Sequence, residues 1–348
     1  MKNKLIFHAV VAVLFLASCK KSENNPANIP KCKITEIITT GQDVTGSDPY
    51  SYTLSYKFDY NDKNLMSGNS VQQNGKTKNN KTTTYGATTN YQYDADGFLI
   101  KQVYQSSSKD LDNLNSSYSF TFTYTYKNGK LEKSVFNNSS TDNKGKTTTE
   151  TRTENYEYNA DGKLSKYSNM SIRDGSSTNT FYLYEYANGI LSKLSYNNGI
   201  SGTVTPLIEI NSQGLLTKEV NGTQEYRYQY DTDGNLLRSE TWRSGIKMYI
   251  NIYEYDTQQN INLLSIPKFK GHPDVSFYLG KDYLATHNIT KDSRGRIIGG
   301  VEKIDYTYAY TYQYNSQNLP ASSEVLLTGS DGKVMQQSTV NYTYKDCQ

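Results

Sequence analysis

The residue with the clearest chemical role in this sequence is Cys19, whose thiol follows a short apolar leader. A basic start and the apolar run Leu5–Leu16 precede it. The four residues that end at Cys19, Leu-Ala-Ser-Cys, have the form of a lipobox, the cleavage and acylation signal of bacterial lipoproteins. The run is shorter than the roughly 20 residues of a membrane-spanning helix. We therefore expect a signal peptide over residues 1–18 and a lipid on Cys19.

Two further cysteines, Cys32 and Cys347, flank nearly all of the remaining chain. An exported protein can form disulfides. A disulfide requires Cα atoms within about 7 Å, so these two can pair only if the first and last strands are neighbours. That holds in a closed barrel and fails in a flat open sheet. The sequence leaves the pairing open.

Other chemistry-bearing residues do not form a recognisable motif. His272 and His287 stand alone, without the spacing of a metal site. The turns Asp94–Gly97 and Asp231–Gly234 resemble the start of a calcium loop, but the twelfth position is Gln in one and Trp in the other. We predict no catalytic residue, no metal and no cofactor. Paired carboxylates for glycan hydrolysis need no sequence motif, so a glycan-active enzyme stays an alternative.

Aromatic side chains are the remaining candidates for binding. The chain contains 33 tyrosines and one tryptophan. Trp242, Tyr249 and Tyr278 could stack on sugar rings as ligand contacts. The alternative is that the tyrosines fill the sheet, because aromatic residues favour strands and can bury a large ring.

The element that must position these residues is a repeated hairpin, best seen in Tyr226–Arg238. Three tyrosines alternate with polar residues, Asp231-Thr-Asp-Gly234 reverses the chain, and two leucines begin the returning strand. Glycine can adopt positive φ in such a turn without a Cβ penalty. Copies recur roughly every 20–35 residues, the spacing of a repeat architecture. The turn glycines are Gly97, Gly129, Gly162, Gly189, Gly214 and Gly234.

These copies predict an all-β fold, a long up-and-down meander of about 18–22 antiparallel strands that is closed or nearly closed on itself. We expect tight turns at one end and longer polar loops, such as Ser106–Ser116, at the other. Alternatives are an open twisted sheet and a spiral. Membrane insertion is a third option, which the alternation of Tyr with Thr, Gln and Lys disfavours.

The predicted domain organisation follows from changes in composition. Residues 19–30 are the lipidated cysteine and a flexible tether, and residues 31–348 are one repeat-built domain. Residues 257–303 break the repeat and form an insertion, partly helical, that packs on the sheet. We expect its apolar part to plug the barrel against the tyrosines of Tyr306–Tyr314, burying Ile261, Leu263, Leu264, Ile266, Phe277, Tyr278 and Leu284.

Two resemblances apply to these features. The unit Tyr91-Gln-Tyr-Asp-Ala-Asp-Gly-Phe-Leu99 resembles the YD repeat of RHS-type surface proteins. More specifically, the lipobox, the hairpins, Phe277–Leu284 and the strand Tyr306–Tyr314 resemble a family of predicted lipoproteins of gut-type Gram-negative bacteria. That family is a domain of unknown function described as having a porin-like fold. The resemblance implies a barrel-like β fold and implies no activity.

Charge narrows the class of partner. The formal net charge is +3, and removal of the leader leaves 35 basic against 34 acidic residues, which excludes an electrostatic nucleic-acid binder. We expect a monomeric, lipid-anchored protein of the outer membrane, either periplasmic or surface-exposed. It has no enzymatic activity and binds a glycan, a peptide or a partner protein. A purely structural envelope component is the other alternative.

Overall fold

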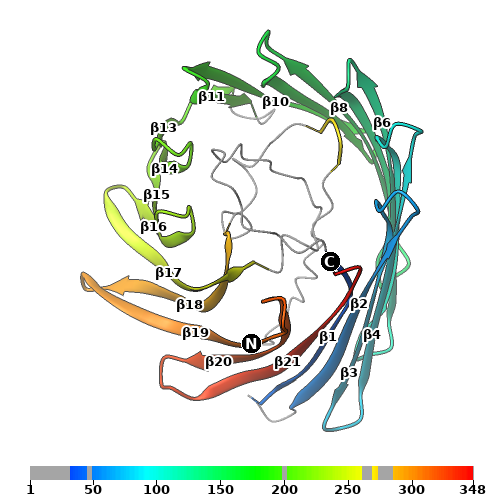
Figure 1. Cartoon of the computed structure of the whole chain (residues 1–348), viewed down its shortest axis with the longest axis vertical. Helices are drawn as coiled ribbons and strands as arrows, with labels where there is room; N and C mark the ends of the chain where they lie inside the picture. The colour runs from blue at the N-terminus through cyan, green and yellow to red at the C-terminus, as the bar shows by residue number, and fades with distance from the viewer. Residues whose placement is uncertain (1–31, 45–48, 198–201, 261–268, 273–284, 348) are drawn as a thin grey trace.

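The chain folds into one antiparallel sheet that curls into a ring (Figure 1). The computed structural model describes residues 32–44, 49–197, 202–260, 269–272 and 285–347. These ranges contain 21 strands and no helix, so none of their segments is a helix able to span a membrane. The strands are β1 (Lys33–Asp43), β2 (Tyr50–Tyr60), β3 (Met66–Thr77), β4 (Thr82–Tyr93), β5 (Leu99–Lys109), β6 (Asn115–Lys127), β7 (Lys130–Thr141), β8 (Thr147–Tyr158), β9 (Leu164–Arg173), β10 (Ser176–Ala187), β11 (Ile190–Asn197), β12 (Thr203–Val204), β13 (Leu207–Ile210), β14 (Leu216–Asn221), β15 (Gln224–Tyr230), β16 (Leu236–Arg243), β17 (Ile246–Gln259), β18 (His287–Ile298), β19 (Val301–Tyr314), β20 (Pro320–Gly329) and β21 (Val334–Lys345).

The strands follow one another around the ring in chain order. Sequential neighbours pair antiparallel from β1 to β12 and again from β13 to β21. The first and last strands also pair, with Ile37 opposite Tyr342. This arrangement confirms the predicted antiparallel meander. The expected helical part of the inner segment finds no support, because the described residues contain no helix.

One seam interrupts the hydrogen-bonded ring. β12 pairs with β11, β13 pairs with β14, and no ladder joins β11 to β13 or β12 to β13 in the described residues. Only Thr205 and Pro206 separate β12 from β13, and proline cannot donate a ladder hydrogen bond. The two short strands are halves of one strand that changes partner at Pro206. This explains how an odd number of strands still brings β1 and β21 together antiparallel.

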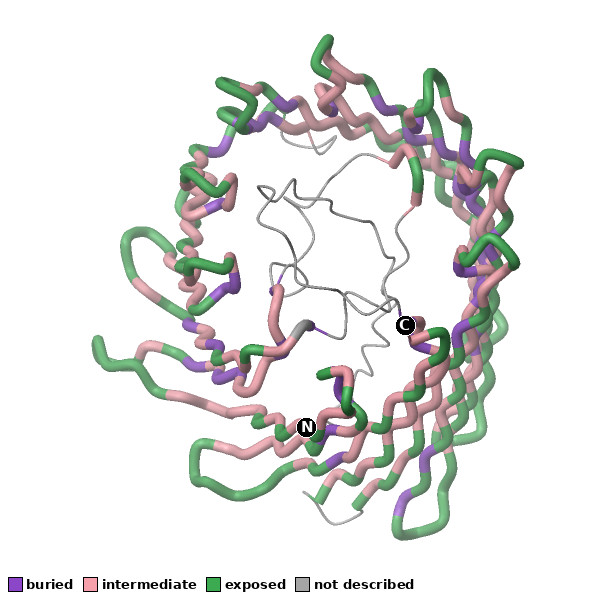
Figure 2. Tube along the Cα trace, viewed as in Figure 1, coloured by how far each residue is buried: buried purple, intermediate pink, exposed green. Residues whose placement is uncertain are grey.

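The two faces of the sheet differ in chemistry. Residues 269–272 lie inside the ring in Figure 1, and the Phe269 ring is 5.5 Å from that of Tyr91 on β4. The tyrosine face is therefore the inner face, and buried residues recur around the wall (Figure 2). In β6 the inner face carries Tyr118, Phe120, Phe122, Tyr124 and Tyr126. The outer face of β6 carries Ser117, Ser119, Thr121, Thr123 and Thr125.

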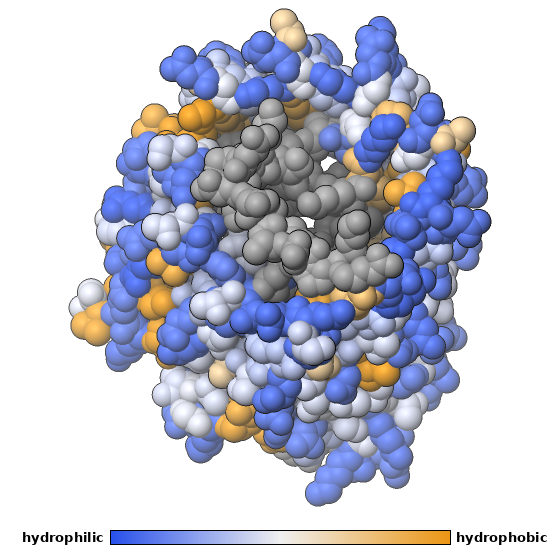
Figure 3. All heavy atoms as spheres, in the orientation of Figure 1, coloured by the Kyte–Doolittle hydropathy of each residue, from blue (hydrophilic) through white to orange (hydrophobic). Residues whose placement is uncertain are grey.

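The outer surface is accordingly polar. Hydrophilic residues predominate on the side that Figure 3 shows, and hydrophobic residues form small separate groups. A barrel that faces lipid carries an apolar outward band and a polar interior. In β6 the aromatic rings face inward and the serine and threonine side chains face outward, the reverse of that arrangement.

Tyrosine hydroxyls hold most of the hairpins to the strand pair before them; the copies that end at Ile210 and Tyr314 are the exceptions. The ladder shifts by a β-bulge at the second tyrosine of each Tyr-x-Tyr pair, and a bulge disrupts the local hydrogen bonds. That tyrosine donates its hydroxyl to the carbonyl that begins the returning strand of the preceding hairpin. The pairs are Tyr60 to Ile34, Tyr93 to Met66, Tyr126 to Leu99, Tyr158 to Leu131, Tyr186 to Leu164, Tyr230 to Leu216, Tyr255 to Leu236 and Tyr344 to Pro320, at 2.7–3.0 Å.

The turns follow from their Asp, Asn and Gly residues. In the β4–β5 turn the Asp94 carboxylate accepts hydrogen bonds from the amides of Asp96 and Phe98, at 3.0 and 2.8 Å. Gly97, Gly129, Gly162, Gly189, Gly214 and Gly234 all have positive φ, between 74° and 84°. In the β19–β20 turn, which has no glycine, Asn318 takes positive φ of 58°, a conformation that asparagine tolerates.

Tight turns also form the opposite end of the ring, contrary to the expectation of long loops there. β5 continues to Lys109 and β6 begins at Asn115, so the expected loop Ser106–Ser116 is mostly strand. The Asp110 carboxylate closes this turn by accepting the amides of Asp112 and Leu114, both at 2.9 Å. Runs of serine look loop-like in composition, but here they pair as strands with polar faces.

The stretch 257–303 contributes to the sheet as well as to the interior. Its residues 287–298 form β18, so less of this stretch lies outside the sheet than we expected. Phe269–His272 packs on the inner wall formed by β4 and β6, and the Gly271 carbonyl accepts the Leu131 amide at 2.7 Å. The apolar residues of the expected plug lie outside the described residues: Ile261, Leu263, Leu264, Ile266, Phe277, Tyr278 and Leu284.

Candidate functional site

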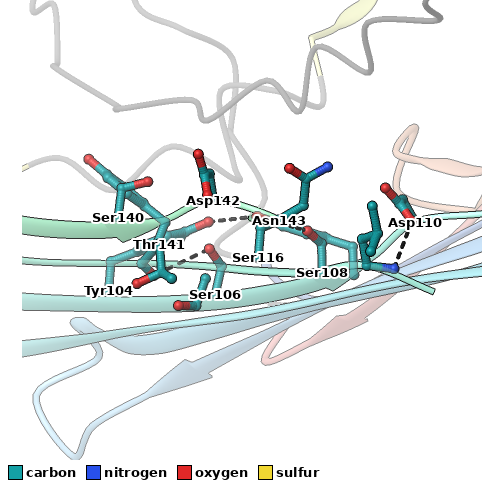
Figure 4. Close-up of a pocket in the computed structure, with 13 residues that line it drawn as sticks. Tyr104, Ser106, Ser108, Asp110, Ser116, Ser140, Thr141, Asp142 and Asn143 are labelled. Atoms are coloured by element: carbon teal, nitrogen blue, oxygen red, sulfur yellow. Dashed lines mark hydrogen bonds between the residues drawn. The ribbon is translucent and has the colours of Figure 1, made fainter. Parts of the chain in front are cut away.

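A pocket opens on the inner face at the end of the ring formed by the Asp110 and Asp142 turns (Figure 4). It has a volume of about 480 Å³. The ends of β4 to β7 and the two turns that follow β5 and β7 build it. Its lining residues are Tyr85, Tyr104, Ser106, Ser108, Asp110, Leu114, Ser116, Ser117, Tyr118, Ser140, Thr141, Asp142 and Asn143.

Tyrosines form the aromatic part of the pocket. The Tyr104 ring stacks on Phe120 at 4.8 Å between centroids, and the Tyr118 ring lies 5.9 Å from Tyr104 at a tilt of 59°. The Tyr85 and Tyr104 hydroxyls are 2.6 Å apart. Burial, together with this hydrogen bond, holds the pKa of Tyr85 well above 10. Burial also raises the pKa of Tyr118, so both phenols stay protonated and can donate hydrogen bonds.

Hydroxyl groups form the polar part of the pocket. The Ser108 and Ser116 hydroxyls face each other across β5 and β6 at 2.6 Å. The Ser106 hydroxyl donates to the Tyr118 carbonyl at 3.4 Å, and Figure 4 shows Ser140 beside these residues. Each hydroxyl is both donor and acceptor. The pocket therefore offers aromatic rings beside a dense set of neutral hydrogen-bonding groups.

Two carboxylates stand at the rim of the pocket. The Asp142 carboxylate accepts the amides of Lys144 and Lys146, both at 2.9 Å, and these hydrogen bonds lower its pKa. The Asp110 carboxylate closes its own turn in the same way. A glycosidase needs one carboxylic acid with a raised pKa to protonate the leaving group. Asp142 is held in the opposite state, so it can accept hydrogen bonds from a ligand but is a poor general acid.

A second polar cluster is enclosed in the wall and has a structural role. Glu154 on β8 is buried, with 2% of its side chain exposed. It accepts the hydroxyls of Ser134, Tyr156 and Tyr167 at 2.5, 2.9 and 3.0 Å, and Arg152 Nε lies 2.9 Å from its carboxylate. A buried charge with this many partners is stabilised in place. The sequence does indicate this cluster, because Arg152, Glu154 and Tyr156 alternate along the chain and therefore share one face of the strand.

The predicted aromatic contacts do not form one site. Trp242 lies on the outer face, where Arg227 stacks over its ring at 4.3 Å and its Nε1 donates to Glu240 at 2.9 Å. Tyr249 is 51% exposed and pairs with Arg296 of β18. Tyr278 lies outside the described residues, as does Cys19. The sequence analysis missed the tyrosines that line the pocket, because Tyr85, Tyr104 and Tyr118 lie outside the Tyr-x-Tyr pairs of the repeat and come together only across neighbouring strands.

Cys32 and Cys347 are joined by a disulfide, with their Cα atoms 4.1 Å apart. The bond lies where β1 and β21 pair and links the first and last strands of the ring. His272 packs on Tyr126, and His287 contacts Asn235. No group of three or more His, Cys, Asp or Glu side chains in the described ranges is placed to hold a metal ion.

Comparisons with known proteins return a weak structural likeness. No family model and no curated protein sequence matches the chain. Among solved structures, a porin-like protein from Bacteroides uniformis is 15% identical, with 90% of this chain and 96% of that chain covered and a TM-score of 0.32. A porin-like protein from Bacteroides vulgatus is 13% identical, with 89% and 98% covered and a TM-score of 0.28. Likenesses this weak carry no argument about function, which rests on the residues of this chain.

Proposed function

We propose that this chain is a lipid-anchored, non-enzymatic protein of the cell envelope that binds a glycan in the pocket at the rim of its ring. The observation that carries the proposal is the composition of the pocket, in which the Tyr104 and Tyr118 rings stand beside the hydroxyls of Ser106, Ser108 and Ser116. A sugar ring presents apolar C–H faces and a rim of hydroxyls. Aromatic faces and neutral donors and acceptors complement both.

The Cys32 end of the chain and the pocket lie at opposite ends of the ring, which supports a pocket that faces away from the membrane. The Cys32–Cys347 disulfide and the repeat turns share one end, where Lys63 Nζ of the β2–β3 turn donates to the Ala95 carbonyl of the β4–β5 turn at 2.5 Å. The pocket is at the other end, where Lys81 pairs with Asp112 at 3.2 Å. Strands of 11–13 residues separate the ends by up to about 35–45 Å. A lipid on Cys19 would hold the first end to the membrane and leave the pocket facing away.

The anchor has its own test. Mass spectrometry of the protein extracted from the membrane fraction should show an N-terminal Cys19 that carries lipid. A Cys19→Ala variant should remain in the soluble fraction or keep its leader. A mature protein that is soluble and begins at another residue would contradict the anchor, while leaving the glycan pocket to be judged separately.

The glycan pocket is tested by a matched pair of variants. A glycan array probed with the mature protein should identify a ligand, and Tyr118→Ala should weaken its binding by about tenfold, the equivalent of one lost aromatic contact. The control is Tyr182→Ala on β10, a similarly half-buried inner-face tyrosine outside the pocket. Equal binding by both variants and the wild type would place the ligand elsewhere, and hydrolysis of the ligand would favour the enzymatic alternative.

A further inference from the structure

A row of five tyrosines runs along the inner face of β19. The residues are Tyr306, Tyr308, Tyr310, Tyr312 and Tyr314, and neighbouring ring centroids are 5.9–6.5 Å apart. All five are half-buried. They share the face of Tyr342, because Tyr310 pairs with Val325 of β20, Val325 pairs with Ser338 of β21, and Tyr342 lies on the same side of β21 as Ser338. The row therefore lines the interior along the length of the strand, on a different part of the ring from the rim pocket.

The hydroxyls of this row differ from those of the repeat tyrosines. Elsewhere, the second tyrosine of each pair donates to a backbone carbonyl, as Tyr158 does to Leu131 at 2.9 Å. Tyr314 likewise has partners, in Asp256 and Asn288. No hydrogen-bond partner of the other four hydroxyls is found among the described residues. The need to hold hairpins together thus explains the repeat tyrosines and leaves these four hydroxyls unexplained.

A charged pair stands beside the row on β18. Asp292 lies opposite Tyr308 and Arg294 lies opposite Tyr306. The Arg294 guanidinium donates to the Asp292 carboxylate from Nε, at 3.1 Å to Oδ2, and from Nη2, at 2.8 Å. Asp292 is 6% exposed at its side chain, whereas Arg294 is 42% exposed. The buried carboxylate fixes the guanidinium in position, and the exposed part of Arg294 remains able to donate to a ligand hydroxyl.

We propose that Tyr306, Tyr308, Tyr310 and Tyr312 form a second carbohydrate-binding surface, one that takes a linear neutral glycan lying along β19. The row offers continuous aromatic surface to successive sugars, as ring edges and faces, and each hydroxyl offers a donor and an acceptor to the sugar beside it. Arg294 donates to a hydroxyl at the Tyr306 end. This inference rests on the proposed glycan-binding function and extends it from a single pocket to a chain of several sugars.

The test compares ligands of different length on the full mature protein. Hexasaccharides and disaccharides of linear glucan, xylan and mannan are titrated by calorimetry against the wild type, Tyr310→Phe and Tyr308→Leu/Tyr310→Leu. We expect the wild type to bind one of the hexasaccharides at least tenfold more tightly than the matching disaccharide. The double variant should reduce this ratio to about one, and Tyr310→Phe should reduce it a few-fold because it removes only a hydroxyl.

A matched control separates binding from folding. Tyr158→Phe removes a hydroxyl that does have a backbone partner, so it should lower the melting temperature and leave the length ratio unchanged. Tyr310→Phe should leave the melting temperature unchanged and reduce the length ratio. If the row variants keep the wild-type ratio, or if Tyr310→Phe lowers the melting temperature as Tyr158→Phe does, the row is packing and the inference is wrong. If the wild type binds no glycan of either length, the proposed function fails and the inference fails with it.

Discussion

At the scale of single residues, the structure assigns the tyrosines distinct roles that composition alone hides. The second tyrosine of a repeat pair supplies a hydroxyl to the bulge of the preceding hairpin, as Tyr126 does to Leu99 at 2.8 Å. Tyr104 and Tyr118 line a pocket, and the Tyr310 hydroxyl has no hydrogen-bond partner in the described part of the chain. A net hydrogen bond is worth about 0.5–1.5 kcal/mol, so the repeated hydroxyl contacts together contribute substantially to stability.

His272 should make the stability depend on pH. Its ring packs on Tyr124, its Nε2 lies 2.8 Å from the Tyr126 hydroxyl, and burial lowers its pKa from 6.5 to about 4. Between these values the unfolded chain binds a proton that the folded chain does not. The free energy of unfolding should therefore fall as the pH drops from about 6.5 to about 4, by up to roughly 3 kcal/mol.

Urea titrations at several pH values in this window measure the effect. His272→Gln removes the titrating group and keeps a polar side chain, so its stability should vary less with pH across the same window. If the free energy of unfolding of His272→Gln varies with pH as steeply as that of the wild type, other groups control the pH dependence.

At the scale of the elements, the hairpin turns depend on backbone conformation. Gly234 has φ of +84°, a conformation that a β-branched residue adopts only at a cost. Gly234→Val should lower the free energy of unfolding by about 1–2 kcal/mol. Gly86→Val is the control, because Gly86 lies within β4, lacks positive φ and has room for a side chain, with no atom within 4 Å of where its Cβ would stand. A urea midpoint that shifts equally in both variants would contradict the role of positive φ.

The seam between β11 and β13 should be the least protected part of the wall. The repeat copy there has Ile208 and Ile210 in place of the two tyrosines, so it has no hydroxyl to give the preceding hairpin, and Pro206 interrupts the ladder. Hydrogen exchange depends on local opening. Peptides that cover 190–197 and 203–210 should exchange faster than those that cover β6 and β7. Equal protection by mass spectrometry would mean that the seam is closed in solution.

At the scale of the whole molecule, a strand pairing and a disulfide join the two ends of the chain. The β1–β21 ladder pairs the first and last strands, and the Cys32–Cys347 disulfide spans 315 residues of sequence. A cross-link over a long loop restricts the unfolded chain strongly. Replacing both cysteines with serine should lower the free energy of unfolding by about 2–5 kcal/mol, with the circular dichroism spectrum of the folded state unchanged because the ladder remains.

Reduction provides the control for this prediction. Dithiothreitol should lower the melting temperature of the wild type to that of the Cys32→Ser/Cys347→Ser variant and should have no further effect on the variant. If the two proteins melt together under oxidising conditions, the bond does not contribute to stability.

The sequence by itself determined the local architecture. Alternation of tyrosine with polar residues, as in Tyr226–Tyr230, and Asp-x-Asp-Gly turns encode strands and reversals through contacts a few residues apart, so the antiparallel meander could be predicted. Serine-rich strand ends such as Ser106–Lys109 were mistaken for loops, because their pairing with β6 depends on neighbours and not on propensity.

Only the tertiary structure decided which side of the ring each repeat faces and which side chains meet. Whether Cys32 reaches Cys347 depends on closure, the sum of small twists over all strands, which no local pattern specifies. The pocket joins residues of β4 to β7, and its tyrosines Tyr85, Tyr104 and Tyr118 come from three different strands, so no short motif marks them. Whether a hydroxyl is available, or a pocket forms between strands, depends on the assembled sheet. The sequence therefore predicted the sheet and not the site.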